Sequence, residues 1–436
     1  MPKTTVIDAP PSGRAGAPAS ARSVALLGPA LVAGVAYVDP GNVASNMTAG
    51  AGYGYLLVWV VVVANVIAWL VQYLSAKLGV VTGRSLPELL GDGLRNRFAR
   101  RAYWLQAELV AMATDIAEVI GGAVALQLLF GLPLLLGGLI TGAVSMALLA
   151  VQGRRGARPF EFVVIGLLAV VTVGFLAGLL VAPPDPAAAL GGLTPRFTDS
   201  GSVLLAASIL GATIMPHAIY AHSALARDRF GAPAAPSAGT TSVATSPSAP
   251  RSPIARLLAV TRWDVTLAMV VAGAVNLGML LLAAATLPGV EGTDSLEGAH
   301  AAISAQLGPL IGTLFAVGLL ASGLASTAVG AYAGAEIMHG LLRVRIAMPV
   351  RRLITLIPAL VILGLGVDPT FALVLSQVAL SFGIPFALIP LVALTARRRI
   401  LGTYANRPWT TVAGIVAVTL LIALNAVLLW LLLTGS

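Results

Sequence analysis

The sequence predicts an all-α integral membrane protein, and three observations lead to that fold class. Of the 436 residues, 58% are hydrophobic and only 10% are charged, with a mean hydropathy of +0.94. Soluble globular domains are about 45–50% apolar and about 25% charged, so this chain must use the bilayer as part of its solvent. Apolar stretches also recur along the whole length, and the basic residues fall between them in a one-sided pattern.

The apolar stretches predict eleven membrane-spanning helices, because a helix needs roughly 20 mostly apolar residues to cross a bilayer. The third and eighth stretches are long and must tilt or project, and the ninth is short. The expected spans are 24–50, 54–80, 102–130, 133–151, 160–182, 200–225, 264–288, 300–340, 352–367, 369–396 and 408–434.

Basic residues set the orientation, since segments on the cytoplasmic side of a membrane are enriched in Lys and Arg. With the N-terminus in the cytoplasm and eleven spans, all 26 Lys and Arg residues except Lys77 and Arg196 fall in inner segments. The expected outer loop 289–299 is acidic, and the C-terminus lies outside. The net charge of +9 then reflects topology, and we expect no nucleic-acid partner. The Ala, Gly and Arg bias is typical of a GC-rich bacterium, which favours the cytoplasmic membrane.

Composition also divides the chain. Residues 1–22 are rich in Pro, Ala, Ser and Gly, which predicts a disordered cytoplasmic tail, and residues 231–255 predict a flexible cytoplasmic linker. Between them, 23–230 hold the first six spans; 256–396 hold spans seven to ten, and 397–436 an inner loop with the last span. The absence of cysteine excludes disulfides and thiolate ligands. We expect the lipid bilayer as a partner and see no sign of an obligate protein partner.

Two spans carry helix-breaking sequences at mid-membrane. The first contains Asp39-Pro40-Gly41-Asn42 and the sixth contains Met215-Pro216-His217. Proline removes a backbone donor, and unwound backbone inside a bilayer is tolerated only where protein buries it or a cavity receives it. Spans one and six open two five-helix repeats, and because five is odd the second is inverted. Paired broken helices in inverted repeats indicate a transport site. Ordinary proline kinks are the alternative.

The side chains at the two breaks suit a cation. Asp39 is an ionisable group near the bilayer centre, which is a functional hypothesis by default. Asn42 adds an amide oxygen, and Met215 adds a soft thioether, which favours a first-row transition metal over Ca²⁺ or Mg²⁺. Core packing is the alternative for Met215. Gln377, in the tenth span, offers either another oxygen to the site or a hydrogen bond between helices.

A second group of ionisable residues occupies the third span. Glu108, Asp115 and Glu118 are spaced 7 and 3 residues apart, which places them on one helical face. Such carboxylate chains serve as proton relays in transporters, and salt bridges to Arg351 and Arg352 are the alternative or an additional role. Histidine titrates near neutral pH, so His217 can bind a metal or carry a proton. The alternative is an interior histidine with its hydrogen bonds satisfied.

These motifs resemble those of the Nramp family, the natural-resistance-associated macrophage proteins, and most closely the bacterial MntH-type manganese transporters. The paired motifs carry the resemblance, which extends through Gly28-Pro29-Ala30, Gly52-Tyr53-Gly54-Tyr55, Gln106 to Asp115, and Ser376-Gln377 followed by Phe382-Gly383. It implies a LeuT-like fold and proton-coupled import of Mn²⁺, Fe²⁺ and related ions such as Co²⁺ and Cd²⁺, with no resident cofactor and no enzymatic activity.

The resemblance also implies roles for individual positions. The metal ligands would be Asp39, Asn42, Met215, the backbone carbonyls of Ala36 and Ala212, and Gln377. The proton route would include His217, Glu108, Asp115, Glu118, Arg351 and Arg352. Two other functions stay open on the same fold: a Mg²⁺ transporter, and a sodium-coupled transporter of organic solutes.

Overall fold

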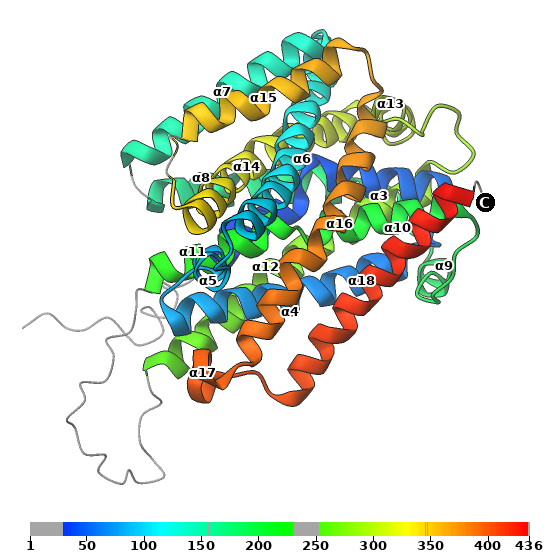
Figure 1. The fold of residues 1–436 in the computed structure, drawn as a ribbon. Coiled ribbons are helices and arrows are strands. Elements are labelled where there is room, and N and C mark those ends of the chain that lie inside the picture. Colours follow the sequence, from blue (N-terminus) through cyan, green and yellow to red (C-terminus); the bar gives the residue numbers. More distant parts are fainter. Residues whose placement is uncertain (1–28, 156, 231–252, 345, 347, 435–436) are drawn as a thin grey trace, which may run out of the picture.

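The computed structural model describes residues 29–155, 157–230, 253–344, 346 and 348–434, and in these residues the chain is helical, with no β-strand. The expected tail 1–22 and the expected linker as far as residue 252 lie outside the described residues. Figure 1 shows the helices, with bounds α2 Pro29–Val35, η1 Ala36–Val38, α3 Pro40–Tyr53, α4 Val58–Thr82, α5 Leu86–Gly93, α6 Arg97–Phe130, α7 Leu134–Arg155, α8 Ala157–Val181, α9 Pro186–Gly191, α10 Ser200–Thr213, α11 Pro216–Phe230, α12 Pro253–Thr286, α13 Leu296–Leu307, α14 Pro309–Leu342, α15 Met348–Gly364, α16 Pro369–Ala396, α17 Arg398–Leu401, η2 Gly402–Tyr404 and α18 Pro408–Thr434.

The first span is broken where the sequence predicts. After α2 and the 3₁₀ turn η1, Asp39 is extended, with φ −77° and ψ 169°, and α3 begins at Pro40. Proline at the first position of a helix costs nothing in hydrogen bonding, because that N–H would have no partner within the helix. Asp39 caps α3 by accepting from the backbone N–H of Asn42 at 2.7 Å. The two half-helices are thus separately terminated.

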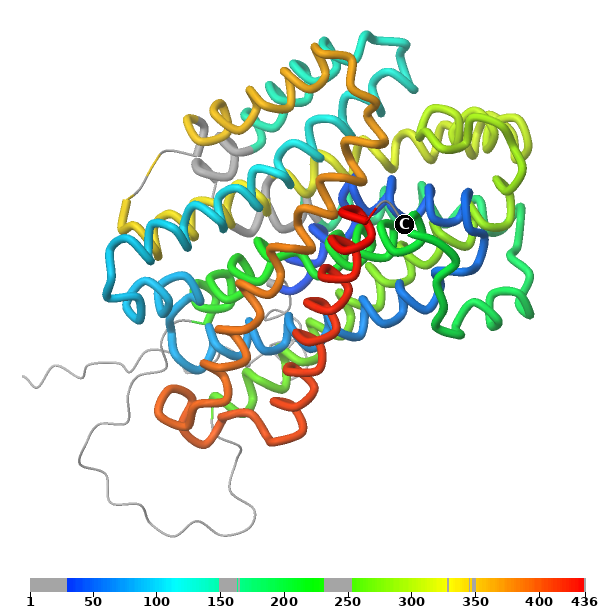
Figure 2. The backbone as a smooth tube through the Cα atoms, turned by 45° about the vertical axis from the view of Figure 1, so that its right-hand side comes forward, coloured from blue at the N-terminus to red at the C-terminus, as the bar shows by residue number. Residues whose placement is uncertain are grey.

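The sixth span is broken in the same way. α10 ends at Thr213 and α11 begins at Pro216, so Ile214 and Met215 form the gap between them. Because Pro216 has no N–H, the i to i−4 ladder cannot run through this point. Figures 1 and 2 both show α3 beside α10, and their contact includes a 2.6 Å hydrogen bond between the hydroxyls of Ser45 and Ser208.

Other helices enclose this centre. α6 packs against α14 and α16, and α12 packs against α3 and α4. Figure 2 shows α7 and α15 side by side along one edge of the molecule, and α18 running along α16. The broken helices therefore lie inside the bundle, with Asp39 and Met215 each 0% exposed.

The eighth span is not the single helix that we predicted over 300–340. It divides into α13 and α14 at Gly308, which has φ +96°, and Pro309 occupies the first turn of α14. Glycine tolerates this φ and proline cannot continue the ladder, so the chain turns here and the membrane-length helix begins at residue 309. α12 also begins at Pro253, well before the expected 264, and so includes the last three residues of the expected linker.

Seven of the described helices are long and apolar enough to cross a membrane, with α10 and α11 counted together. α7 and α8 contain shorter apolar stretches, Leu134–Leu148 and Ile165–Val181. The first span is not among the seven because its two half-helices are short, with 7 and 14 residues, and α15 has only 17 residues.

Basic residues gather at one end of the described bundle, which we call the arginine-rich end. Arg84, after α4, and Arg343, after α14, both pair with Asp92, and Arg227 of α11 pairs with Glu88 of α5. The opposite end holds Asp199, which accepts a hydrogen bond from Tyr53 at 2.7 Å. Arg351 and Arg352 depart from the predicted pattern: they lie within α15 and are 4% and 1% exposed, so they are not loop charges.

Candidate metal site and ion-pair network

Asp39 and Asn42 hold each other in a fixed orientation at the first break. One carboxylate oxygen of Asp39, Oδ1, accepts from the backbone N and from Nδ2 of Asn42, at 2.7 and 2.9 Å. The same Nδ2 donates to the carbonyl of Ala212 at 2.9 Å, across to the second break. Both amide protons of Asn42 are then used. Asp39 Oδ2 and Asn42 Oδ1 are buried and have no hydrogen-bond partner among the described residues.

Gln377 reaches both breaks from α16. A Cβ placed on Gly41 would lie 1.8 Å from Gln377 Nε2, and one on Gly211 would lie 1.9 Å from the Gln377 backbone oxygen. Only glycine permits so close an approach at these two positions. Gln377 donates from Nε2 to Ser376 at 3.1 Å, and its Oε1 is a further buried oxygen without a partner in the described chain.

Met215 and the two predicted backbone ligands complete the set. Met215 lies in the gap of the sixth span, fully buried. The carbonyl of Ala212 accepts from Asn42 in this structure, and Ala36 lies in η1, also fully buried. The structure thus brings Asp39, Asn42, the Ala212 carbonyl and Gln377 to the junction of the breaks, where Met215 also lies.

Two residues that the sequence analysis missed support the first break. Asn276 of α12 donates to the carbonyl of Tyr37 at 2.8 Å, and Ser322 of α14 donates to the carbonyl of Val38. These carbonyls have lost their helical partners, and a buried carbonyl without a donor is costly. The available signal was a polar side chain in the middle of an apolar span, but it does not indicate which carbonyl the side chain reaches.

The chemistry of this junction is that of buried acceptors. A carboxylate oxygen, two amide oxygens and a thioether lie where the helices are unwound, and no donor in the described chain satisfies the three oxygens. A cation is the kind of partner these acceptors suit, whereas an anion would be repelled by Asp39. No group of three or more His, Cys, Asp or Glu side chains suited to a metal occurs among the described residues, so a metal would depend on the amides and Met215.

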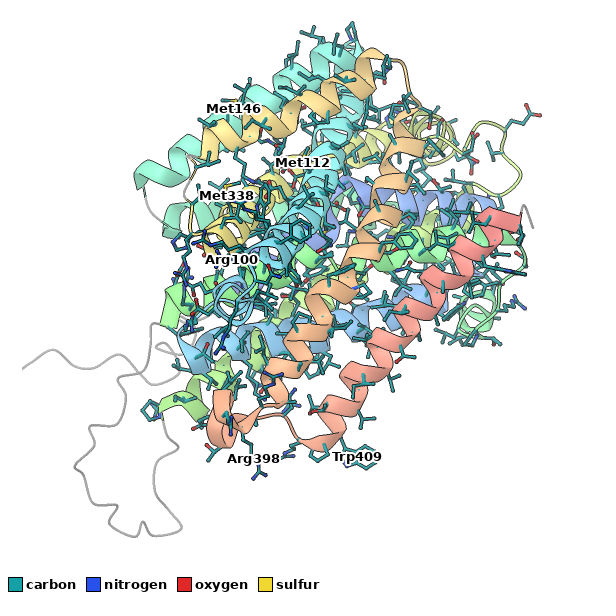
Figure 3. The ribbon with its side chains drawn as sticks, in the orientation of Figure 1. Arg100, Met112, Met146, Met338, Arg398 and Trp409 are labelled. Atoms are coloured by element: carbon teal, nitrogen blue, oxygen red, sulfur yellow. The ribbon has the colours of Figure 1, made fainter. Side chains whose placement is uncertain are left out.

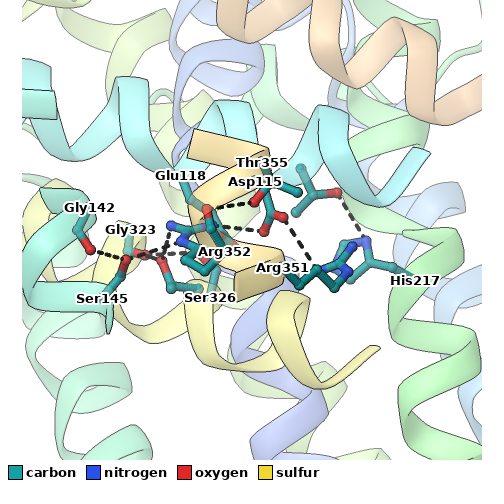
Figure 4. Close-up of polar contacts among 12 residues, drawn as sticks. Asp115, Glu118, Gly142, Ser145, His217, Gly323, Ser326, Arg351, Arg352 and Thr355 are labelled. Carbon is teal, nitrogen blue, oxygen red and sulfur yellow. Dashed lines mark hydrogen bonds and ion pairs between the residues drawn. The ribbon is translucent and has the colours of Figure 1, made fainter. Parts of the chain in front are cut away.

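The three carboxylates of α6 pair with the two arginines of α15, and Figure 4 shows Asp115 and Glu118 beside these arginines. Glu108 Oε1 lies 2.8 Å from Arg351 Nη2, and Arg352 Nη1 lies 2.8 Å from Asp115 Oδ1 and 3.2 Å from Glu118 Oε2. We call these five residues the ion-pair network. The salt bridges that we considered from the sequence are therefore present. A proton-relay role stays a prediction.

The surroundings of the network hold Arg352 in one position. Two further guanidinium hydrogens go to Ser145 at 3.1 Å and to Thr327 at 3.3 Å. Three carboxylates face only two guanidinium groups, so the ionised network carries an excess negative charge. The two arginines neutralise two of the three negative charges. The network therefore favours binding of a further proton or cation.

The network and the breaks are connected by two contacts. His217, two residues beyond Met215, places Nδ1 3.1 Å from the hydroxyl of Thr114, the residue before Asp115. Its Nε2 has no partner among the described residues. On the other side, Pro40 packs against α6 so closely that a Cβ on Gly121 would lie 2.0 Å from it. Both broken spans therefore contact α6 directly.

Comparison with known proteins shows which family the chain resembles. Residues 30–431 match the family model of the natural resistance-associated macrophage protein-like proteins, Nramp. The divalent metal cation transporter MntH of Mycobacterium tuberculosis is 59% identical over 410 residues, covering 94% of this chain and 92% of that protein. The MntH of Deinococcus radiodurans is 46% identical over 428 residues, covering 97% and 93%.

Solved structures agree as well. A manganese transporter of Eremococcus coleocola superposes with a TM-score of 0.80 at 30% identity, covering 96% of this chain and 88% of that one. MhsT, solved with L-phenylalanine, superposes with a TM-score of 0.59 at 13% identity, covering 91% and 98%. The second likeness concerns the fold alone, and it confirms the LeuT-like arrangement expected from the sequence.

Proposed function

The chain belongs to the Nramp family, and from this premise we propose that it imports divalent transition-metal ions across the cytoplasmic membrane. Mn²⁺ is the principal proposed substrate, with Fe²⁺, Co²⁺ and Cd²⁺ as related ions and H⁺ as the coupling ion. The proposed orientation has the N-terminus in the cytoplasm and the C-terminus outside. The names of the relatives, which describe divalent metal and manganese transport, support this substrate class.

The observation that carries the proposal is the set of unpartnered acceptors at the two breaks. Asp39 Oδ2, Asn42 Oδ1 and Gln377 Oε1 are buried without donors, and the thioether of Met215 is buried in the same junction. Unpaired buried oxygens are costly, and a divalent ion would compensate that cost. One carboxylate with amide oxygens and a thioether suits a borderline ion such as Mn²⁺ or Fe²⁺ better than the hard ions Ca²⁺ and Mg²⁺.

Burial of the site supports alternating access. Asp39, Asn42, Met215 and Gln377 are each 0% exposed, so an ion could reach them only after surrounding helices move. The half-helices α2 and α11 are the natural moving parts, because the breaks free them from α3 and α10. A continuous channel would need an open path past the same residues.

The ion-pair network supports proton coupling. The network is linked to the metal site through Thr114, the residue before Asp115, which contacts His217, two residues after Met215. A divalent ion arriving beside Asp39 would lower the proton affinity of the nearby carboxylates, so metal binding and proton release would be linked. The ion pairs also stabilise the fold, and both roles can belong to the same residues.

Metal uptake into proteoliposomes tests the proposal. Wild-type protein should take up Mn²⁺ under an inward proton gradient, Asp39→Ala should abolish uptake, and Met215→Ala should allow Ca²⁺ or Mg²⁺ to compete. Met338→Ala removes a thioether from a distant part of α14 and serves as the matched control. If the wild type takes up no Mn²⁺ under any gradient, the proposal fails. Uptake of Mg²⁺ would then establish a Mg²⁺ transporter, and uptake of an organic solute under a sodium gradient would establish a sodium-coupled solute transporter.

A pH-sensitive dye inside the same vesicles tests the coupling. Mn²⁺ addition should acidify the interior in wild type, and Asp115→Asn should abolish this acidification. Asp92→Asn, which removes a carboxylate from the surface at the arginine-rich end, should leave it unchanged. If the wild type takes up metal without any proton movement, proton coupling is refuted, and the proposed metal site is unaffected by that result.

A further inference from the structure

A cleft at the arginine-rich end lies apart from the metal site and the ion-pair network. It runs between α4, the start of α12, and the turn from η2 to α18, with a volume of about 960 Å³, and a second lobe of about 440 Å³ adjoins it. Both volumes fall in the range of ligand pockets, about 300–1,000 Å³. The residues that matter in its walls are Trp69, Tyr73, Arg262, Trp263 and Arg407, with Lys77 in the second lobe.

The charge in this cleft is uncompensated. Arg262 and Arg407 are exposed, and within the described part of the chain no carboxylate lines either lobe. Three other arginines at this end do pair with carboxylates: Arg84 and Arg343 with Asp92, and Arg227 with Glu88. Lys77 donates to a neutral partner, Asn406 Oδ1, at 2.9 Å. Three cations thus line one concave surface, and none of the described lining residues is a carboxylate.

Aromatic rings form the walls. Trp69 and Tyr73 are stacked, with centroids 6.0 Å apart and planes at 12°, and the Arg262 guanidinium lies 6.0 Å from the Trp69 ring centroid. The indole N–H of Trp69 donates to Thr266 at 3.0 Å. Trp263 is 73% exposed. Tryptophan and tyrosine with adjacent basic residues are typical of the boundary between the bilayer and water.

The cleft is already formed in the folded chain. Asn406 fixes the turn before α18: its backbone N–H donates to the Thr395 carbonyl at 2.9 Å, and its Nδ2 donates to the Thr395 hydroxyl at 2.8 Å. The third contact of Asn406, with Lys77, fastens this turn to α4. A ligand would therefore not have to order the wall that carries Arg407.

An apolar track leads out of the cleft along α12. Trp263, Leu267 and Val270 are 73%, 47% and 60% exposed, and their spacing places them on one helical face. Trp409, at the start of α18, is 84% exposed at the same end, as Figure 3 shows beside Arg398. A soluble anion would need only the arginines, whereas a phospholipid would use the arginines for its phosphate and this track for its acyl chains.

We propose that the cleft binds the headgroup of an anionic phospholipid, with the phosphate between Arg262 and Arg407 and an acyl chain along α12. Basic pockets between membrane helices bind anionic headgroups in this way. The ligand differs from the transported ion and the proton, and the site would stabilise the packing of α4, α12 and the turn before α18.

Native mass spectrometry of the full chain, titrated in detergent with phosphatidylglycerol, tests this. The double variant Arg262→Gln, Arg407→Gln should bind the lipid about 25-fold more weakly, because each basic residue near an anionic surface contributes about fivefold. The variant Arg398→Gln, Arg399→Gln makes the same charge change on exposed residues outside the cleft, and it should bind like wild type. Phosphatidylcholine should bind weakly to all three proteins, and excess inorganic phosphate should not displace phosphatidylglycerol.

Three results would overturn the proposal. Equal losses in both double variants would show diffuse attraction to basic charge, and equal binding by all three proteins would show that the cleft is not used. Displacement of phosphatidylglycerol by inorganic phosphate would identify a site for soluble anions. Mn²⁺ uptake reports on the metal site separately, so failure here leaves the proposed transport function untouched.

Discussion

Removal of Arg352 is expected to be among the most damaging single changes in the chain. The side chain is 1% exposed, and its Nη1 lies 2.8 Å from Asp115 and 3.2 Å from Glu118. Arg352→Met keeps most of the aliphatic volume but leaves Glu118 without its cation and Asp115 with only the longer contact to Arg351, at 3.6 Å. Breaking a buried ion pair from one side costs about 3–5 kcal/mol. Hydrogen bonds to Ser145 and Thr327 are lost as well, so we expect the upper part of that range.

Reversible denaturation in mixed micelles gives the free energy of unfolding for comparison with a matched variant. Arg343 is also paired with a carboxylate, Asp92, but their side chains are 70% and 48% exposed. Arg343→Met should therefore cost no more than about 1 kcal/mol, as exposed ion pairs do. The reasoning also requires rescue: adding Asp115→Asn and Glu118→Gln to Arg352→Met should restore stability, since the orphaned charges are gone. Equal losses for the two arginine variants, or no rescue, would refute it.

Two further predictions concern backbone contacts and pH. Gly211→Ala should unfold more readily and lose Mn²⁺ uptake, because its Cβ would lie 1.9 Å from the Gln377 backbone oxygen. Gly52→Ala, which meets nothing within 4 Å, should preserve both properties, and a functional Gly211→Ala would contradict the close approach. The backbone N–H of Ser202 is the main cause that holds the pKa of Asp199 below its usual range, and a side-chain hydrogen bond from a tyrosine adds to it. The stability from Asp199 is thus complete above its unfolded-state pKa, about 3.9, and is lost as the pH falls through the lower folded-state pKa. Asp199→Ala should lower the free energy of unfolding by about 1 kcal/mol at neutral pH, because a helix cap is lost. The difference from wild type should shrink when unfolding is measured in acid. A difference that stays constant with pH would contradict this role of Asp199.

The sequence predicted the features that depend on local chemistry. Pro40 and Pro216 cannot donate to a helical ladder, so the breaks follow from residue type alone, and the structure has both. Glu108, Asp115 and Glu118 share a face because helical periodicity fixes it. The eighth span was misjudged because an apolar composition continues across Gly308-Pro309, where only the backbone turn shows that one helix has ended.

Contacts across hundreds of residues could not be predicted in this way. Nothing in the spacing of Asn276 indicates that its amide reaches the Tyr37 carbonyl at 2.8 Å. For Arg352 the sequence left two interpretations open, a basic residue of an inner segment and a salt bridge to the carboxylates of the third span, and the structure shows the salt bridge. A basic residue near the end of an apolar segment can face solvent or pair with a buried carboxylate. For Arg352, only the packing of α15 against α6 and α7 decides which of these occurs.

The sequence by itself determined that the chain is a helical membrane protein with two broken helices, a carboxylate at one break and a thioether at the other. These features follow from hydropathy and from the backbone chemistry of proline. Only the tertiary structure decided which oxygens at the junction lack donors, that Gln377 reaches both breaks, and that Arg262 and Arg407 face a cleft without a carboxylate. Whether a polar group is satisfied depends on neighbours brought close by folding, and that information lies in the packing of helices distant in sequence.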